Sequence, residues 1–159
     1  MSNLRRYPSL GHPVFLTLVC RDRALYLGDD SAKALFLDVL REIKQEQSFR
    51  THAHVVLNDH AHLLLSPDGA EPSSIVQRLK LRFTRRLSPA GLGSLWQPRF
   101  WDHHIRDAED MARHMDYIHF NPVKHGLADC AADYPWSSLP AHVERGHYPP
   151  NWGEGGMPR

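Results

Sequence analysis

The sequence predicts an α+β protein built on an antiparallel sheet with helices on one face. Two observations carry this prediction: apolar, β-branched runs typical of strands, and segments between them whose apolar residues recur at helical spacing. The expected strands cover residues 14–20, 54–57, 60–65 and 95–105, and the expected helices cover 31–47 and 72–87. Their order, strand, helix, strand, strand, helix, strand, is the ferredoxin-like (RRM-like) arrangement.

The first half of the chain gives clear local signals for these elements. The segment 14–20 is apolar and β-branched, as in a buried strand. Asp29 and Ser31 offer capping side chains where the first helix should begin. Asn58 and Asp59 form a natural tight turn, so the strands on either side should pair as an antiparallel hairpin.

The second half adds a third helix, which lies outside the ferredoxin-like order. Pro72 opens the second helix, and Asp107 caps the third. We expect the third helix to end at Asn121, because Pro122 disfavours helical geometry in the residue before it.

Length and composition limit the possible classes of protein. We expect the 159 residues, 1–159, to form one domain with an irregular C-terminal tail from about residue 141. No apolar run approaches the roughly 18 residues of a membrane span, so no membrane partner is expected. The two cysteines, Cys20 and Cys130, form no C-x-x-C pair, which argues against a disulfide framework and fits the cytoplasm. The net charge of +1 decides nothing about nucleic acid.

Two histidines, His60 and His62, occupy alternate positions of the third expected strand. Alternate residues of a strand point to the same face, about 7 Å apart at Cα, so two neutral imidazoles can bind one divalent cation. The simpler alternative is a pair of sheet histidines hydrogen-bonded to solvent or to neighbours. His52 and His54 repeat the spacing upstream, and we interpret that pair as structural.

The third helix carries a tyrosine at the edge of its apolar stripe. Met111, Met115 and Ile118 form the stripe, and Tyr117 lies beside it, where packing can hold the ring while the hydroxyl stays exposed. Asn121, four residues on, projects next to Tyr117. The alternative is an amphipathic tyrosine at a core boundary, with Asn121 as a helix cap.

The second helix is basic, and no acidic residue lies between Pro72 and Ala90. Its basic residues suit phosphates, which bind guanidinium strongly and without regard to sequence. A solvated helix face is the simpler alternative, although such a face usually mixes both charge signs. The DNA-binding candidates are Arg78, Lys80, Arg82, Arg85 and Arg86, followed by Arg99 among the aromatic residues Trp96, Phe100 and Trp101. These aromatics, interleaved with arginine, suit base stacking, and two of them are equally expected in the core.

Taken together, the motifs resemble one family. The hairpin LNDHAHLLLSP, the block WQPRFWDHHIRDAEDMARHMDYIHFNPVKHGL and the later DYPWSS are similar to those of REP-associated tyrosine transposases, single-tyrosine enzymes of the HUH endonuclease superfamily. The resemblance covers roughly residues 5 to 140, with the motifs in the family's order. It implies a ferredoxin-like core with the histidine pair on a central strand and the catalytic tyrosine on the additional helix.

The resemblance also implies roles for individual residues. Tyr117 matches the nucleophile, His60 and His62 match the metal-binding pair, and Asn121 stands where a third metal ligand is found. The implied substrates are single-stranded DNA hairpins from repetitive extragenic palindromes (REP). The implied reaction gives a 5′-phosphotyrosine and a free 3′-OH. A phenol, with a pKa of about 10, needs a cation on the phosphate, and Mg²⁺ or Mn²⁺ is expected.

The N-terminal element that the family uses to read the hairpin is matched only in part. Arg5 and Arg6 are expected to contact DNA there, while His12 and Pro13 replace the usual small and aromatic residues.

Other functions stay open at this point. A catalytically idle, domesticated DNA-hairpin-binding module would keep the arginines but have no use for Tyr117 beside His60 and His62. A histidine-based nucleotide hydrolase would need a third histidine where Leu64 stands. A relaxase usually has a much larger chain. The resemblance favours a monomer in the cytoplasm, associated with the nucleoid, and leaves open a dimer that exchanges the tyrosine helix.

Overall fold

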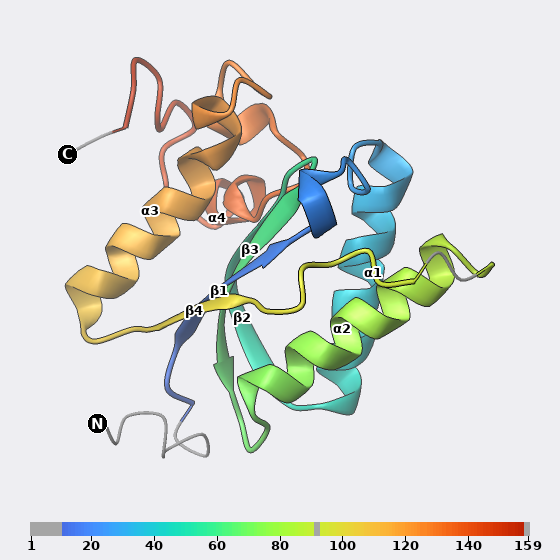
Figure 1. Ribbon diagram of the computed structural model, residues 1–159. Helices are drawn as coiled ribbons and strands as arrows, with labels where there is room; N and C mark the ends of the chain where they lie inside the picture. The colour runs from blue at the N-terminus through green and yellow to red at the C-terminus, as the bar shows by residue number, and fades with distance from the viewer. Residues whose placement is uncertain (1–10, 91–92, 158–159) are drawn as a thin grey trace.

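The computed structural model describes residues 11–90 and 93–157, which form a four-stranded antiparallel sheet with helices on both faces (Figure 1). The strands are β1 (Val14–Val19), β2 (Phe49–Val56), β3 (His60–Pro67) and β4 (Trp101–His104). They lie in the order β2-β3-β1-β4, so β1 and β3 are central. This confirms the predicted α+β fold. No helix among the described residues is long and apolar enough to cross a membrane.

One face of the sheet is covered by α1 (Asp30–Glu46) and α2 (Pro72–Leu87), which lie side by side (Figure 1). Asp29 caps α1 by accepting a hydrogen bond from the Ala32 amide at 2.8 Å. Leu63 and Leu65 of β3 point into this face's core, as their alternation with the histidines requires. The core is built from buried apolar side chains.

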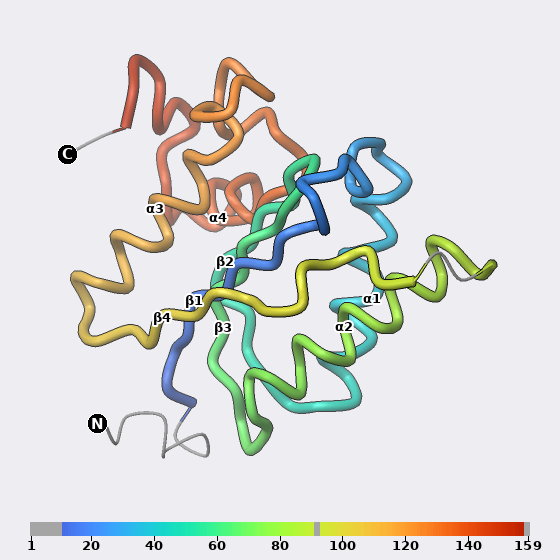
Figure 2. The backbone as a smooth tube through the Cα atoms, in the orientation of Figure 1, coloured from blue at the N-terminus to red at the C-terminus, as the bar shows by residue number. Residues whose placement is uncertain are grey.

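The other face is covered by α3 (Ala108–Lys124), which packs on β2 and β3 (Figure 2). The core beneath it is smaller and includes Val55, Leu64 and Ile118. Asp107 caps α3, because its carboxylate accepts from the Asp110 amide at 2.8 Å. The additional helix of the sequence prediction therefore lies opposite the first two.

Several element bounds differ from the prediction. The strand expected over residues 95–105 is confined to β4, Trp101–His104. Helix α3 continues through Pro122 to Lys124, although proline removes one intrahelical hydrogen bond. Pro122 is buried, and the His125 amide still donates to the Asn121 carbonyl at 3.0 Å, so tertiary packing outweighs the local preference. Strand β2 begins at Phe49 instead of residue 54, which places His52 inside the strand.

The C-terminal part of the chain covers the outer edge of β2. The Val56 amide donates to the Trp136 carbonyl at 2.9 Å, and the Ser138 amide donates to the His54 carbonyl at 3.0 Å. The Tyr134 hydroxyl donates to the Val56 carbonyl at 2.6 Å. The motif DYPWSS is thus the segment that closes this edge of the sheet.

The predicted irregular tail from about residue 141 is wrong in part. A short helix, α4 (Leu139–Glu144), begins two residues earlier, and Tyr148 donates from its hydroxyl to Asp116 of α3 at 2.8 Å. Two 3₁₀ turns, η3 (Arg21–Arg23) and η4 (Ala131–Asp133), complete the elements of the described residues. The tail is a packed layer over α3, which sequence irregularity alone did not indicate.

Candidate active site

His60 and His62 lie side by side on the face of the sheet that α3 covers. Their ring centroids are 4.9 Å apart, and the residues are 6% and 4% exposed. Ala61 between them points into the opposite core, so the two-residue period of the strand keeps both imidazoles on one side.

Each of these imidazoles has a hydrogen-bond partner on its Nδ1 atom. His60 Nδ1 lies 2.7 Å from the Asp59 carboxylate, and His62 Nδ1 lies 2.9 Å from the Thr17 hydroxyl. Because a carboxylate only accepts, His60 carries its hydrogen on Nδ1 and keeps a lone pair on Nε2. Partners of this kind orient metal-binding histidines in proteins.

Burial keeps both imidazoles neutral. It lowers the pKa of His62 to about 3. It also lowers the pKa of His60, although the Asp59 carboxylate acts in the opposite direction. Since only a neutral imidazole can donate a lone pair to a cation, both side chains are in the binding form at neutral pH.

Tyr117 reaches the same place from α3. Its ring centroid is 5.4 Å from that of His62 and 6.0 Å from that of Phe15. The ammonium group of Lys124 lies 4.9 Å from the tyrosine ring centroid. The structure therefore brings together the tyrosine and the histidine pair that the sequence singled out, and adds a cation beside the phenol.

Asn121 is fully buried one helical turn after Tyr117. Its Nδ2 donates to the Tyr117 carbonyl at 3.0 Å, which leaves Oδ1 buried without a hydrogen-bond partner in the described residues. His62 Nε2 is buried and unpartnered in the same way. Such atoms are rare in proteins, because an unsatisfied buried polar atom is costly. An amide oxygen and a neutral imidazole nitrogen are both donors that divalent cations accept, so the chemistry of these residues fits a metal site.

A cavity of about 500 Å³ opens beside these residues. Phe15 and Thr17 of β1 and His62 of β3 form its floor, and His114 and Tyr117 of α3 form one wall. The cavity gives a substrate access to the tyrosine and to one histidine of the pair.

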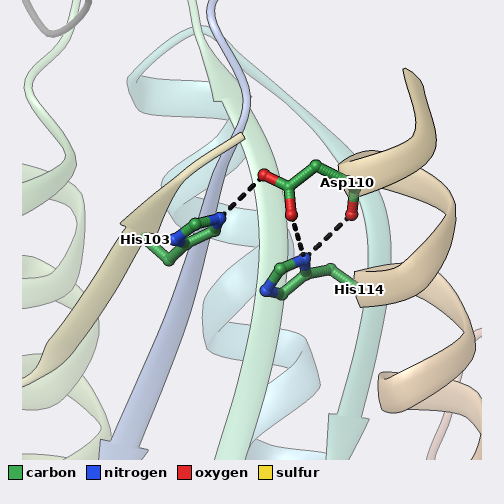
Figure 3. Close-up of side chains that lie close together, drawn as sticks. All are labelled: His103, Asp110 and His114. Carbon is green, nitrogen blue, oxygen red and sulfur yellow. Dashed lines mark hydrogen bonds and ion pairs between the residues drawn. The ribbon is translucent and has the colours of Figure 1, made fainter. Parts of the chain in front are cut away.

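His114 is held at this cavity by a cluster that the sequence did not reveal (Figure 3). Asp110, which is 1% exposed, accepts from His103 Nε2 at 2.8 Å and lies 3.2 Å from His114 Nδ1. Burial would raise the pKa of Asp110, but the hydrogen bonds from His103 and from the Arg106 amide lower it overall. The sequence signal was the i, i+4 spacing of Asp110 and His114 in α3.

The ligand atoms of His103, Asp110 and His114 lie within 4.8 Å of one another, close enough to hold a metal ion. However, the Asp110 carboxylate already receives hydrogen bonds from His103 and from Arg113, the latter at 3.2 Å. The positive charge of Arg113 opposes a cation there. We therefore interpret this cluster as a brace between β4 and α3.

The basic residues of α2 lie on the opposite side of the sheet from Tyr117. The helix carries no acidic residue of its own, but acidic residues of α1 pair with part of its basic face. Arg82 makes two bonds with Glu46, at 2.6 and 2.8 Å, and Arg86 makes two bonds with Glu42, at 2.6 and 2.7 Å. Arg78 lies 3.7 Å from Glu46. These pairs could not be predicted from local patterns, because the paired residues lie 36 to 44 positions apart along the chain.

The other predicted DNA-binding residues differ in their surroundings. Lys80 donates to the Gln97 and Arg99 carbonyls at 3.0 and 3.3 Å, which ties the segment after α2 to the helix. Arg85 and Arg99 are exposed and have no ion pair within the described residues. Arg5 and Arg6 lie outside the described residues.

Comparison with known proteins gives the family. The model of the family described as "Transposase IS200 like" matches residues 12–121. A REP-associated tyrosine transposase of Escherichia coli K12 is 38% identical over 154 residues, which cover 96% of this chain and 91% of the relative.

Two solved structures are similar to the chain. A REP-associated tyrosine transposase bound to a REP hairpin is 37% identical with a TM-score of 0.81, covering 96% of this chain and 91% of that one. A protein of Deinococcus radiodurans R1 described as a transposase is 26% identical with a TM-score of 0.50, over 67% of this chain and 87% of its own.

The chain belongs to the IS200-like transposase family, whose members cleave and rejoin DNA. Its relatives over nearly the whole length are REP-associated tyrosine transposases, which confirms the resemblance drawn from the motifs.

Proposed function

We propose that the protein is a metal-dependent endonuclease and strand transferase that acts on single-stranded DNA hairpins through Tyr117. The proposal rests on one observation: Tyr117 of α3 lies beside His62, whose neighbour His60 completes a buried, neutral histidine pair. The similar transposase that was solved with a REP hairpin supports a hairpin of this type as the DNA.

In this proposal His60, His62 and Asn121 hold the cation through Nε2 atoms and the amide oxygen. The unpartnered His62 Nε2 and Asn121 Oδ1 support this assignment. Mg²⁺ favours oxygen ligands and imidazole also suits Mn²⁺, so these are the two candidate ions. When bound, the cation polarises the scissile phosphate and stabilises the departing 3′ oxygen.

Tyr117 supplies the nucleophile. Its phenolic oxygen bonds to phosphorus, the bond from phosphorus to the 3′ oxygen breaks, and the phenol's proton leaves to water while the 3′ oxygen gains one. The product is a 5′-phosphotyrosine with a free 3′-OH on the other fragment. Attack by the 3′-OH of a second strand reverses the step and rejoins DNA without ATP, because the phosphotyrosine conserves the bond.

The site residues come from one chain, which supports a monomer as the working unit. We place the protein with the nucleoid in the cytoplasm, because its proposed substrate is DNA. Arg85 and Arg99 are the candidates for the DNA backbone that are exposed and have no ion pair within the described residues. At Arg82 and Arg86 a phosphate would have to displace the glutamates of α1, which makes those two residues weaker candidates.

The test is formation of a covalent adduct. The protein is incubated with synthetic hairpins bearing single-stranded flanks, with Mn²⁺ or Mg²⁺, and the products are separated under denaturing conditions. We expect a protein–DNA adduct that Tyr117→Phe abolishes and that EDTA prevents. Tyr148→Phe is the matched control, because the Tyr148 hydroxyl bonds to Asp116 of α3 but Tyr148 itself does not line the cavity at Tyr117.

An adduct that persists in Tyr117→Phe would exclude Tyr117 as the nucleophile. Hairpin binding without any adduct in either metal would support the alternative, a catalytically idle DNA-hairpin-binding module.

A further inference from the structure

Trp101, the first residue of β4, is 71% exposed. The neighbouring aromatic residues behave as core: Trp96 is 2% exposed, and Phe100 packs against the main core. A tryptophan left in water on a regular strand gains nothing for folding. The residues that follow it, Asp102, His103 and His104, are polar, so the indole is not part of an apolar patch of the kind that docks another protein.

The strand register places this indole on the catalytic face. Trp101 pairs with Thr17 of β1, and Thr17 pairs with His62 of β3. Directly paired residues of neighbouring strands point to the same face. His62, Thr17 and Trp101 therefore form one row across the sheet, and strand spacing puts Trp101 roughly 10 Å from His62.

The same row is continuous with the cavity at Tyr117. Thr17 forms part of the cavity floor, and Trp101 is the next residue outward on the sheet. Helix α3 packs on β2 and β3, and the high exposure of Trp101 shows that the helix does not cover this end of the row. A single strand of DNA that enters the cavity across β1 would therefore pass the indole of Trp101.

We propose that Trp101 is a base-stacking subsite that holds one unpaired nucleobase of the DNA strand next to the scissile phosphate. This inference rests on the proposed function. An indole offers a π-face to any base, and such stacking is largely independent of sequence. Bases inside a duplex have both faces covered by their neighbours, so the subsite selects unpaired DNA beside the hairpin.

The first test leaves the protein unchanged. A synthetic DNA hairpin with single-stranded flanks is prepared as a series, each member with one abasic nucleotide at a different flank position. Affinity is measured by fluorescence anisotropy in the Tyr117→Phe background, which prevents covalent reaction. We expect one position at which the abasic change raises Kd by roughly 5- to 150-fold, the range of a base–aromatic stack.

The second test links that position to the indole. Trp101→Ala should raise Kd for the intact hairpin by a similar factor and should remove the sensitivity to the abasic nucleotide, whereas Trp101→Phe should keep most of both. Leu81→Ala is the matched control, because Leu81 is an exposed apolar side chain, 49% exposed, on α2 beyond the opposite face. An unchanged Kd in Trp101→Ala, or an equal loss at every abasic position in both proteins, would overturn the subsite.

The outcomes separate the subsite from the function it rests on. If the unsubstituted protein forms no covalent adduct with any hairpin, the proposed function fails. If it forms the adduct and Trp101→Ala keeps its affinity, only the stacking subsite fails.

Discussion

The two faces of the β-sheet use the same strand for opposite purposes. On the side of α1 and α2, Ala61, Leu63 and Leu65 of β3 lie in a dry apolar core. On the side of α3, the alternate positions of the same strand carry His60 and His62, with polar partners and a cavity beside them. The core on the side of α1 and α2 stabilises the fold. That stability offsets the unfavourable free energy of burying polar groups on the side of α3.

The largest expected effect is on the chemistry of the α3 face. His62→Ala should lower adduct formation by about a hundredfold or more, since a cation supplies several kcal/mol of transition-state stabilisation. The melting temperature should change little, because the substitution also removes the buried His62 Nε2 atom, whose lack of a hydrogen-bond partner destabilises the fold. His52→Ala is the matched control from the other H-x-H pair, and adduct yields measured on denaturing gels compare the two. Equal losses in both variants would contradict the assignment.

Leu63, the next residue of β3, should affect stability and leave the chemistry intact. Leu63→Ala should reduce the free energy of unfolding by about 2–5 kcal/mol, because it opens a cavity in a fully buried core. Urea denaturation measures the change. Below the melting transition the variant should still form the adduct, and a selective loss of adduct in a folded variant would show that the two faces are not independent.

A smaller effect is expected at the residue behind the histidine pair. Asp59→Asn should weaken Mn²⁺ affinity by about 10- to 100-fold, because the carboxylate that orients the His60 ring is lost. Titration of adduct formation with Mn²⁺ gives the midpoint. Excess metal should restore the yield, which distinguishes weaker binding from a misfolded site.

Acid should destabilise the fold through buried neutral histidines, which include His62 and His119, whose pKa values burial lowers to about 3, and one on the other face, His54. His54 pairs with Leu63 in the register, and burial, helped by the positive charge of Arg41, lowers its pKa to about 4. The unfolded chain binds the proton at the ordinary pKa of about 6.5 and the folded chain does not. The free energy of unfolding should therefore fall as the pH is lowered from about 6.5 to about 4.

Denaturation at several pH values checks this dependence. His54→Gln should reduce the slope by the share of one histidine, whereas His147→Gln, at an exposed histidine, should leave it intact. A slope that persists unchanged in His54→Gln would assign the acid sensitivity to other groups.

The smallest expected effect is on the salt dependence of DNA binding, which should differ between Arg99 and Arg82. Arg99→Ala should weaken hairpin binding and reduce the salt slope of the affinity by about one. Arg82→Ala should leave that slope unchanged, because the guanidinium is already paired with two glutamates of α1. Binding isotherms at several salt concentrations measure both slopes, and a reduced slope for Arg82→Ala would bring α2 back into the DNA path.

Features that depend only on neighbouring residues in the chain could be predicted from the sequence. The alternation in β3 predicted the shared face of His60 and His62, and helical spacing predicted Tyr117 beside the buried stripe. Partners set by long-range packing were not predictable. Thr17 reaches His62 only through the pairing of β1 with β3, and neutralisation of Arg82 depends on how α1 packs against α2.

The same reason explains the errors at element ends. Pro122 should have ended α3 at Asn121, but Pro122 is buried and the helix continues for three more residues, to Lys124. The sequence also could not tell which aromatic residue near Arg99 stays in water, because that depends on the position of β4 at the edge of the sheet.

The segment from Trp136 to Ser138 has a consequence for how copies of the protein behave in solution. An uncovered strand offers unpaired amides and carbonyls that invite another chain to add a strand and begin aggregation. Trp136 and Ser138 occupy these groups on β2, the longer of the two outer strands. The DYPWSS motif thus protects the protein from self-association, and a version shortened before it should be poorly soluble even though every proposed catalytic residue is present.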